Sequence, residues 1–558
     1  MPRLLIIGLD GVGLDLVEEF IARGQMPCLE KLLQRGTSAA LTSVLPPTTL
    51  PAWTSVFTGA SPSDHGIPDF TERTGYRIRF VGAGQRRLGT VFRYLNQHGL
   101  TTGTAWFPAT YPPEPLNGYQ ISGWDSPVTH AGDDSFVHPK SLHGEMSTKF
   151  KKEHLSFDAI DEFEKNHDWY QNAAESLVQH IKQRREMAKW LLSEHPTDIA
   201  AFYFGEADTA AHHFWAFHDP LSPRRPRDVS PELRAALGNV YRELDAAVQN
   251  LIDAVGEDTP VVLVSDHGSG GTGTTAVYLN RMLEKANLLK FKKRRLSLVN
   301  TSFTRNTAPR LIPRGLRRSL FRFAGGFAPS YLESRTRFAG IDWERTIAFS
   351  EEVSYAPSIW FNQLGREKNG QLPYRDRESA TAAVRDTAFA LKDSSGNKIV
   401  KRVIPRRELH TGRFAHLFPD IVIELEEING YLPACLPSHA TPGEAVSFIP
   451  PAEHLGSKGR SMPGCHTRAG IFIAVGPDID RACTVAARIE EVASWICGLL
   501  GVEPASWFVQ PQTGPFKKNA GDETSKKGFT WNEPGGVYTP AEERIVAERL
   551  RRLGYLEG

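Results

Sequence analysis

Three apolar runs, each followed closely by acidic or histidine side chains, constrain the fold of this chain more than any other feature of its sequence. A short apolar run without polar alternation is typical of a strand that is buried on both faces, as in a parallel sheet. Ligands of open α/β proteins bind at the carboxyl ends of such strands. The side chains that follow the runs are therefore candidates for a functional site. The runs are residues 4–9, followed by Asp10; residues 198–204, followed by the segment GEAD that ends in Asp208; and residues 260–265, followed by Asp266 and His267.

The spacing of the other segments predicts helices between these strands. With 558 residues, 40% of them hydrophobic, the chain can bury a large core. We therefore expect one large α/β body with inserted elements. The further elements expected are strands at 39–45, 347–361, 420–424 and 471–475, helices at 14–23, 28–35, 170–192, 274–288, 378–391 and 481–500, and a basic loop at 398–407.

Thr49 lies at the centre of the segment PPTTLPAWTSVFT, residues 46–58, which opens a helical run. Exposed N–H groups at a helix N-terminus favour an anion such as a phosphate. Taken alone, the pattern also fits a plain helix cap with Pro51 in the first turn. The other motifs make Thr49 the candidate for a reacting hydroxyl.

Asp208 and His212 are four residues apart, which on a helix places both side chains on one face and suits two ligands of one metal ion. His213 lies about 100° round the helix and is the weaker candidate. A charged helix start is the alternative interpretation of the same spacing. His466, four residues ahead of Gly470, supplies the third ligand that this pair lacks.

Charge and cysteine content exclude several classes of partner and compartment. A net charge of +1 gives no general argument for binding a nucleic acid polymer. The five cysteines form no close C-x-x-C pair, and only four consecutive apolar residues precede Gly8. A reduced, cytoplasmic location is therefore expected. The cysteines are Cys28, Cys435, Cys465, Cys483 and Cys497.

Residues 290–337 carry 13 Lys or Arg side chains against one acid, Glu333. Part of this segment is a short basic amphipathic stretch, which suits contact with anionic lipid or glycan, or cover for an anionic substrate. A solvated basic face that is offset by acidic surface elsewhere is the alternative. The sequence leaves this choice, and the oligomeric state, open.

Five separated motifs occur in the order found in the alkaline phosphatase superfamily. The chain most resembles its type I phosphodiesterase/nucleotide pyrophosphatase branch, and the resemblance covers residues 1–505. The motifs are LIIGLDG, the Thr-x-Pro step within PPTTLPAWTSVFTG, the Asp208-x-x-x-His212 pair, SDHG and GCHTRAGIF.

The resemblance implies a three-layer αβα sandwich with a mainly parallel central sheet and inserted cap elements. Insertions are expected at about 135–167, 290–340 and 362–415, and a polar linker with a C-terminal helix at 506–558. The resemblance also implies two zinc ions, although other divalent metals fit the same donors. Asp208, His212 and His466 would hold one ion, and Asp10, Asp266 and His267 the other, with Thr49 between them as a shared ligand.

The expected activity is metal-dependent hydrolysis of phosphate diesters or nucleotide pyrophosphates, small phosphorylated substrates, through a phosphothreonine at Thr49. Two positions depart from well-known members of the branch, because Ala52 and Phe70 stand where those members carry asparagine. The second asparagine resembles a phosphate-oxygen ligand. A phosphomonoesterase or a phosphoglycerate-mutase-like phosphotransferase is therefore the alternative. A catalytically inactive scaffold is the third hypothesis. The presence of all six ligand residues and the nucleophile argues against it.

Overall fold

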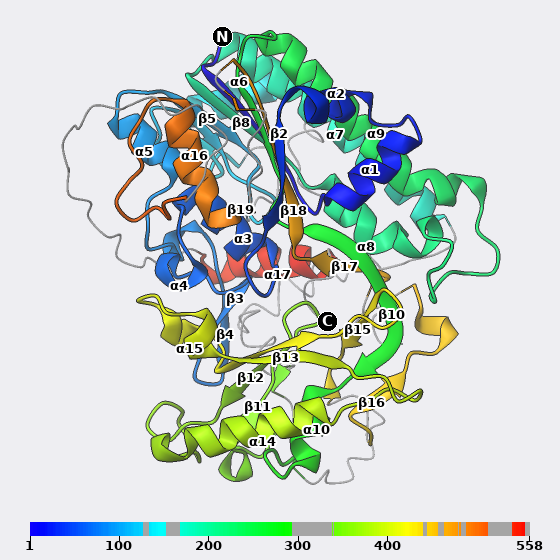
Figure 1. Cartoon of the computed structure of the whole chain (residues 1–558). Coiled ribbons are helices and arrows are strands. Elements are labelled where there is room, and N and C mark those ends of the chain that lie inside the picture. The colour runs from blue at the N-terminus through cyan, green and yellow to red at the C-terminus, as the bar shows by residue number, and fades with distance from the viewer. Residues whose placement is uncertain are drawn as a thin grey trace.

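A nine-stranded sheet organises the upper body of the protein, as the computed structural model shows (Figure 1). The first apolar run of the sequence, β1 (Leu4–Leu9), lies near its middle and is completely buried. The structure describes residues 1–126, 133–151, 168–292, 337–338, 340–438, 443–455, 462–477, 479–480, 487–511 and 538–552.

The central sheet is mainly parallel. Among its strands, only β18 and β7 run antiparallel to their neighbours. The sheet order puts β1 between the strands built from the other two apolar runs. In spatial order the strands are β19 (Ala487–Arg488), β2 (Thr37–Thr42), β18 (Ala469–Val475), β9 (Val261–Val264), β1, β8 (Ile199–Phe204), β5 (Thr102–Ala105), β6 (Gly118–Ile121) and β7 (Val137–His138).

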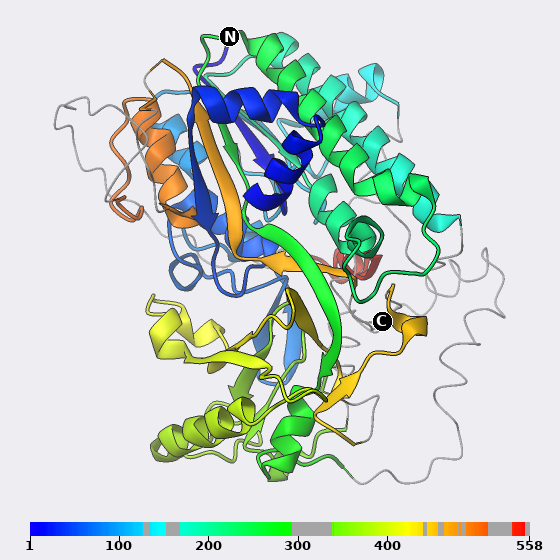
Figure 2. The ribbon, with the colours of Figure 1, turned by 45° about the vertical axis from the view of Figure 1, so that its right-hand side comes forward.

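Helices cover both faces of this sheet (Figures 1 and 2). Each turns an apolar stripe toward the strands, and together they enclose the main hydrophobic core. One face carries α1 (Leu14–Ala22), α2 (Pro27–Arg35), α7 (Trp169–Glu194), α8 (Glu206–His218) and α9 (Pro231–Val255); the other carries α3 (Thr49–Thr58), α5 (Val91–Gln97) and α16 (Val492–Leu499).

A second body lies below the first and has a hydrophobic cluster of its own. The long strand β10 (Gly268–Val277) leads from the edge of the central sheet into this body, as Figure 2 shows. Its other elements are β3 (Thr71–Thr74), β4 (Arg77–Phe80), α10 (Leu279–Lys285), β11 (Ala348–Phe349), β12 (Ser358–Phe361), α14 (Arg377–Phe389), β13 (Val400–Pro405), α15 (Arg406–Leu409), β14 (Ile421–Leu425), β15 (Tyr431–Cys435) and β16 (Val446–Phe448).

The second body contains three sheets, of which the smallest is the antiparallel pair β3-β4. In the second, β10 lies between β15 and β16 and also pairs with β17 (Gly464–Thr467). In the third, the strand order is β11-β12-β14-β13. The remaining helices of the described chain are α4 (Pro62–His65), α6 (Lys140–Lys149) and α17 (Pro540–Arg552).

The expected three-layer αβα sandwich is confirmed, and so are the buried strands and most helices around them. The expected strand at 39–45 begins and ends earlier, as β2, because only residues up to Thr42 pair with β18. Within 481–500 the described part begins with the short strand β19, and the helix α16 starts only at Val492.

One expected element was wrong in extent and another in type. The helical pattern at 274–288 overlaps the end of β10, because the Gly/Thr-rich stretch up to Val277 pairs with β15 and β16. Only α10 is helical there. The basic loop expected at 398–407 contains β13, whose pairing with β14 gives its exposed basic residues an extended backbone.

The expected division of the chain stays a prediction. The range 362–415 supplies α14 and β13 to the second body, whereas most of 290–340 and the second half of 135–167 lie outside the described residues. The C-terminal helix α17 packs back on the first body, where Arg549 donates a hydrogen bond to the carbonyl oxygen of Trp124 over 2.6 Å.

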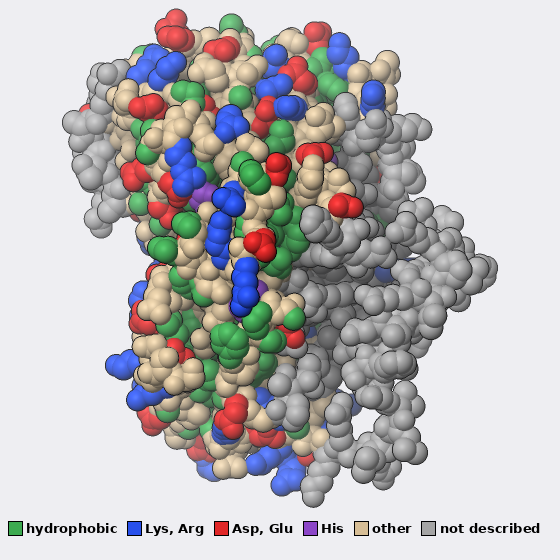
Figure 3. All heavy atoms as spheres, turned by 90° about the vertical axis from the view of Figure 1, so that its right-hand side faces the viewer, with side chains coloured by type: hydrophobic (Ala, Val, Ile, Leu, Met, Phe, Trp, Pro, Cys, Tyr) green, Lys and Arg blue, Asp and Glu red, His purple; other side chains and the backbone are tan. Residues whose placement is uncertain are grey.

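Basic and acidic side chains are interspersed over the coloured part of the face drawn in Figure 3. Apart from its first three residues and Arg337, the basic segment 290–337 lies outside the described part. No helix among the described residues combines the length and the apolar character needed to cross a membrane.

His65 joins α4 to α3, the helix that carries Thr49. Its Nδ1 accepts the backbone N–H of Ile67 over 3.2 Å, and its Nε2 lies 3.0 Å from Ser55 Oγ. Burial, and then the charge of Arg86, lowers the pKa of His65 from 6.5 to about 3. The ring is therefore neutral in the folded protein at ordinary pH.

This burial predicts a pH-dependent loss of stability. The unfolded chain takes up a proton at His65 below pH 6.5 and the folded chain does not until about pH 3. The free energy of unfolding therefore falls as the pH drops through this window, by up to about 1.4 kcal/mol per pH unit from this residue. Urea unfolding between pH 4 and 7 should give a shallower pH slope for His65→Asn than for the wild type. The exposed His98→Asn is the matched control, and equal slopes for wild type and His65→Asn would contradict the assignment.

Candidate active site

Two strand ends place the first group of polar side chains. β1 and β9 are adjacent and parallel, with Gly8 opposite Val264. Asp10 and Asp266 each follow two residues later, so both carboxylates reach the same edge of the sheet. His267 comes directly after Asp266 and completes this group. All three side chains are buried.

The helix α8 supplies the second group. It follows β8, whose last residue pairs with the last residue of β1. One turn of this helix separates Asp208 from His212, and Asp208 Oδ1 lies 3.4 Å from His212 Nε2. His213 points elsewhere, with its ring packed against Trp169 at 5.1 Å between centroids. The i, i+4 spacing thus brings together the two residues that the sequence singled out.

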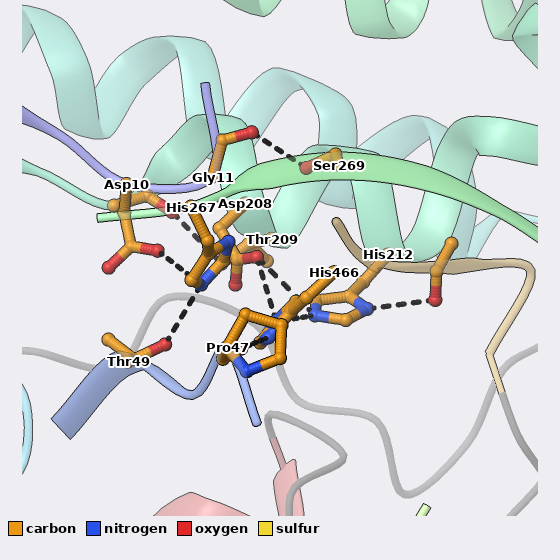
Figure 4. A network of polar contacts seen from close by, with 12 residues as sticks. Asp10, Gly11, Pro47, Thr49, Asp208, Thr209, His212, His267, Ser269 and His466 are labelled. Carbon is orange, nitrogen blue, oxygen red and sulfur yellow. Dashed lines mark hydrogen bonds and ion pairs between the residues drawn. The ribbon is translucent and has the colours of Figure 1, made fainter. Parts of the chain in front are cut away.

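His466 joins the second group through a strand pairing that spans two hundred residues. β17 pairs antiparallel with the start of β10, and Ser269 lies opposite His466. His466 Nε2 is 2.9 Å from His212 Nε2 and 3.3 Å from Asp208 Oδ1. Its ring also stacks on His267, with 3.8 Å between centroids. The structure therefore brings all six expected ligand residues to one place. Five of them are labelled in Figure 4: Asp10, Asp208, His212, His267 and His466.

Each of the three histidines has Nδ1 within hydrogen-bond distance of a backbone carbonyl. Since a carbonyl only accepts, Nδ1 must carry a proton, and Nε2 of the neutral ring keeps its lone pair. The Nε2 atoms of His212 and His466 then lie 2.9 Å apart with their lone pairs facing each other, an arrangement that a proton or a cation must bridge. The pairs are His212 with Gly464 at 3.0 Å, His267 with Gly268 at 3.0 Å and His466 with Pro47 at 2.6 Å.

Around His267, two carboxylate oxygens converge on Nε2. Asp266 Oδ2 lies at 3.3 Å and Asp10 Oδ1 at 3.5 Å. Both oxygens are buried, and neither accepts a hydrogen bond from any residue that the structure describes. Buried carboxylate oxygens without donors are costly unless a cation compensates them. This group therefore fits a metal ion by its own chemistry.

The hydroxyl of Thr49 lies beside the same group. α3 begins at Thr49, and among the described residues no side-chain cap hydrogen bond closes its N-terminus. Thr49 Oγ1 is 3.5 Å from His267 Nε2, as Figure 4 shows. The expected nucleophile and the ligand residues thus meet where the first turn of a helix offers its N–H groups to an anion.

Burial and mutual repulsion shift the pKa values of the carboxylates in this site. Burial, and then the charge of Asp208, raises the pKa of Asp10 to about 7. Burial and the charges of Asp10 and Asp208 raise the pKa of Asp266 well above its ordinary value. Burial also acts on Asp208, but the charge of His212 and the hydrogen bond from His466 outweigh it and lower its pKa. Divalent cations would relieve this repulsion.

The histidine pKa values follow from the same balance. Burial lowers the pKa of His212. Burial, and then the charge of His466, lowers the pKa of His267 well below its ordinary value. For His466 the hydrogen bond and charge of Asp208 outweigh burial, so that its pKa is raised.

Glycine and serine fix the loop after β1 against the ligand residues. Gly11 has φ of +69°, and a Cβ at this position would lie 2.8 Å from Cβ of Asp208. Ser269 Oγ donates to the carbonyl oxygen of Gly11 over 2.7 Å. Only glycine meets both the backbone and the space requirement here. The loop thus brings the end of β1 against the start of α8.

Ala52 and Phe70 both lie in the core. Ala52 is fully buried in α3, and Phe70 packs against Trp124 and Tyr355 with centroids 5.9 and 5.8 Å apart. Neither side chain can donate a hydrogen bond to a phosphate oxygen. The surroundings of Phe70 are instead aromatic.

Sequence reasoning missed two residues that hold Asp10. Trp53 Nε1 donates to Asp10 Oδ2 over 3.0 Å, and Tyr203 Oη donates to the same oxygen over 2.6 Å. For Trp53 the sequence contained a signal, because this residue is four positions after Thr49 and therefore lies on the same helix face. Tyr203 had no such signal, since it lies inside an apolar strand run.

The solved structures that match this chain share little sequence with it. Phosphonoacetate hydrolase from Sinorhizobium meliloti 1021, in complex with phosphonoformate, is 14% identical with a TM-score of 0.48, over 88% of this chain and 94% of that chain. Murine ectonucleotide pyrophosphatase/phosphodiesterase 5 is 12% identical with a TM-score of 0.47, over 89% of this chain and 95% of that chain. The human form is 13% identical with a TM-score of 0.46, over 92% and 96%. No curated protein matches the sequence.

The family model described as type I phosphodiesterase / nucleotide pyrophosphatase matches residues 4–314, more than half of the 558-residue chain. The match includes Thr49 and every expected ligand residue except His466. The chain therefore belongs to the type I phosphodiesterase / nucleotide pyrophosphatase family and is a metal-dependent phosphoester hydrolase.

Proposed function

We propose that this protein is a two-zinc phosphohydrolase that cleaves phosphate diesters or nucleotide pyrophosphates through a phosphothreonine at Thr49. The observation that carries the proposal is the meeting of six ligand side chains and the Thr49 hydroxyl at one buried sheet edge. Asp208, His212 and His466 would hold one ion, and Asp10, Asp266 and His267 the other.

Zinc suits this donor set better than magnesium or calcium. Three imidazole nitrogens and three carboxylates form two mixed sets of three, and each set leaves a coordination position open as catalytic zinc sites do. Magnesium and calcium prefer all-oxygen surroundings. The backbone carbonyls that orient the three histidines are the outer contacts that zinc-bound imidazoles usually make.

The residues divide the work of an in-line displacement. The first N–H groups of α3 would hold a phosphate oxygen while Thr49 Oγ forms a bond to phosphorus and the bond to the leaving oxygen breaks. A water molecule then attacks phosphorus on the opposite face, and the bond to Thr49 Oγ breaks. When bound, the two ions supply activation of the hydroxyl and stabilisation of the charge on the attacking and leaving oxygens.

Phe70 affects whether the expected substrate is a phosphate diester or a monoester. Members of the family act on small phosphorylated substrates, and a diester presents one charged oxygen fewer than a monoester. The burial of Phe70 among aromatic side chains removes a polar contact from the phosphate site, and a basic group elsewhere would replace it for a monoester. A phosphomonoesterase or phosphotransferase is therefore the second candidate. The cytoplasmic location expected from the cysteines belongs to the same proposal.

Thr49→Ala should abolish turnover while leaving two bound metal ions per chain, because the hydroxyl attacks phosphorus but is not needed to hold the carboxylates and imidazoles. Thr49→Ser should retain measurable turnover. The matched control is Thr54→Ala on the same helix, whose buried hydroxyl donates only to the carbonyl oxygen of Leu50. Steady-state kinetics and metal analysis of the three variants check this. Turnover of Thr49→Ala at the wild-type rate would refute the assignment.

His212→Ala and His213→Ala form a matched pair for the metal assignment. Both histidines are buried neighbours on α8, but only His212 faces Asp208 and His466. We expect His212→Ala to lose one metal ion per chain and to lower turnover at least 100-fold. His213→Ala should keep the metal content and lose only packing stability against Trp169. Loss of a metal ion in His213→Ala but not in His212→Ala would show that His213 is the ligand.

The rates of the zinc-loaded protein on a nitrophenyl phosphate diester and the matching monoester decide between the two candidate functions. We expect a higher kcat/KM for the diester, because the chain belongs to the type I phosphodiesterase / nucleotide pyrophosphatase family. Thr49→Ala corrects for contaminating phosphatase. A monoester preference would transfer the assignment to the phosphomonoesterase.

A further inference from the structure

The two oxygens of the Asp10 carboxylate have opposite surroundings. Oδ2 accepts two hydrogen bonds, from Trp53 Nε1 at 3.0 Å and from Tyr203 Oη at 2.6 Å. Oδ1 is buried, accepts none from the residues that the structure describes, and lies 3.5 Å from His267 Nε2. One oxygen is therefore saturated by donors and the other is turned toward the ligand cluster.

The direction of the bond from Tyr203 is fixed by a third donor. Trp124 Nε1 lies 3.4 Å from Tyr203 Oη, and an indole nitrogen only donates. The phenol oxygen therefore receives from Trp124, and its own proton is directed to Asp10. The segment that carries Trp124 is itself held by the C-terminal helix, since Arg549 donates to the Trp124 carbonyl oxygen.

The donors on Asp10 come from elements that also shape the rest of the site. β8 lies beside β1, with Tyr203 opposite Gly8. A Cβ at Gly8 would lie 2.7 Å from the Trp53 indole, so that only glycine leaves room for this ring over β1. Trp53 shares α3 with Thr49. The nucleophile and one donor to Asp10 are thus parts of one rigid helix.

We propose that Tyr203 and Trp53 are positioning residues that make Asp10 a monodentate metal ligand, which coordinates through Oδ1 alone. A carboxylate held by two donors on Oδ2 cannot rotate to present that oxygen, so only Oδ1 is available for coordination. The two bonds also draw negative charge toward Oδ2 and fix the plane of the carboxylate before metal binds. This inference rests on the proposed function, because it takes Asp10 as a ligand of one of two ions.

Tyr203→Phe removes one donor and keeps the ring, so it tests the proposal with little change of packing. Zn²⁺ binding to the full chain is measured by competition with a chelator, which yields a dissociation constant for each ion. We expect one ion to bind ten- to a hundredfold more weakly and the other to change less than about threefold. Turnover should recover when zinc is raised above the weakened constant.

Tyr241→Phe is the matched control, because Tyr241 is equally buried and its hydroxyl has no hydrogen-bond partner among the described residues. It should bind both ions as the wild type does. Trp53→Phe provides a second variant that lacks a donor to Asp10, and it decides the question if Tyr203→Phe fails to fold. The same ion should be weakened in both variants.

The outcomes separate this inference from the proposed function. A wild-type protein that binds no zinc refutes the proposed function itself. A wild-type protein that binds two ions, together with Tyr203→Phe and Trp53→Phe variants that bind both as tightly as Tyr241→Phe, overturns only the positioning role. Equal weakening of both ions in the two variants also overturns it, since a positioning contact on Asp10 acts on one ion.

Discussion

The rest of the site depends on one electrostatic constraint, the crowding of three buried carboxylates and three imidazole lone pairs at one edge of a sheet. Each group alone would be expensive to bury, and burial, followed by the charge of Asp208, raises the pKa of Asp10 to about 7. The fold tolerates this because the groups sit on strand ends and helix starts that the core holds rigidly. A divalent cation would turn the same crowding into coordination, which accounts for the oxygens of Asp10 and Asp266 that have no donor among the described residues.

Rigidity at this edge comes from elements that serve more than one purpose. α3 carries Thr49 and, one turn later, the indole that donates to Asp10. β10 begins beside the central sheet, pairs with the strand that bears His466, and then continues into the second body. Movement of α3 or β10 would therefore shift the nucleophile or a ligand together with its support. Such shared elements are one means by which a protein holds reactive groups within the tolerance that catalysis needs.

Local patterns in the sequence were sufficient wherever a few neighbouring residues decide the outcome. The apolar runs predicted β1 and β9 because a buried strand needs only its own side chains to be recognised. The four-residue spacing predicted that Asp208 and His212 face one side of α8, and the structure agrees. The Gly/Thr-rich start of β10 and the basic β13 were not recognised as strands. The first has few apolar side chains, and in the second Lys401 and Arg402 interrupt the apolar residues. Pairing partners from elsewhere in the chain decide their conformation.

The sequence by itself determined the chemistry available to this protein: which residues end the buried strands, which pair shares a helix face, and that a threonine opens α3. The tertiary structure alone decided how these groups combine. His466 joins His212 only through the pairing of β17 with β10, and Tyr203 reaches Asp10 only because β8 lies beside β1. Chain segments two hundred residues apart meet through sheet order and packing of the whole core, which no local pattern contains.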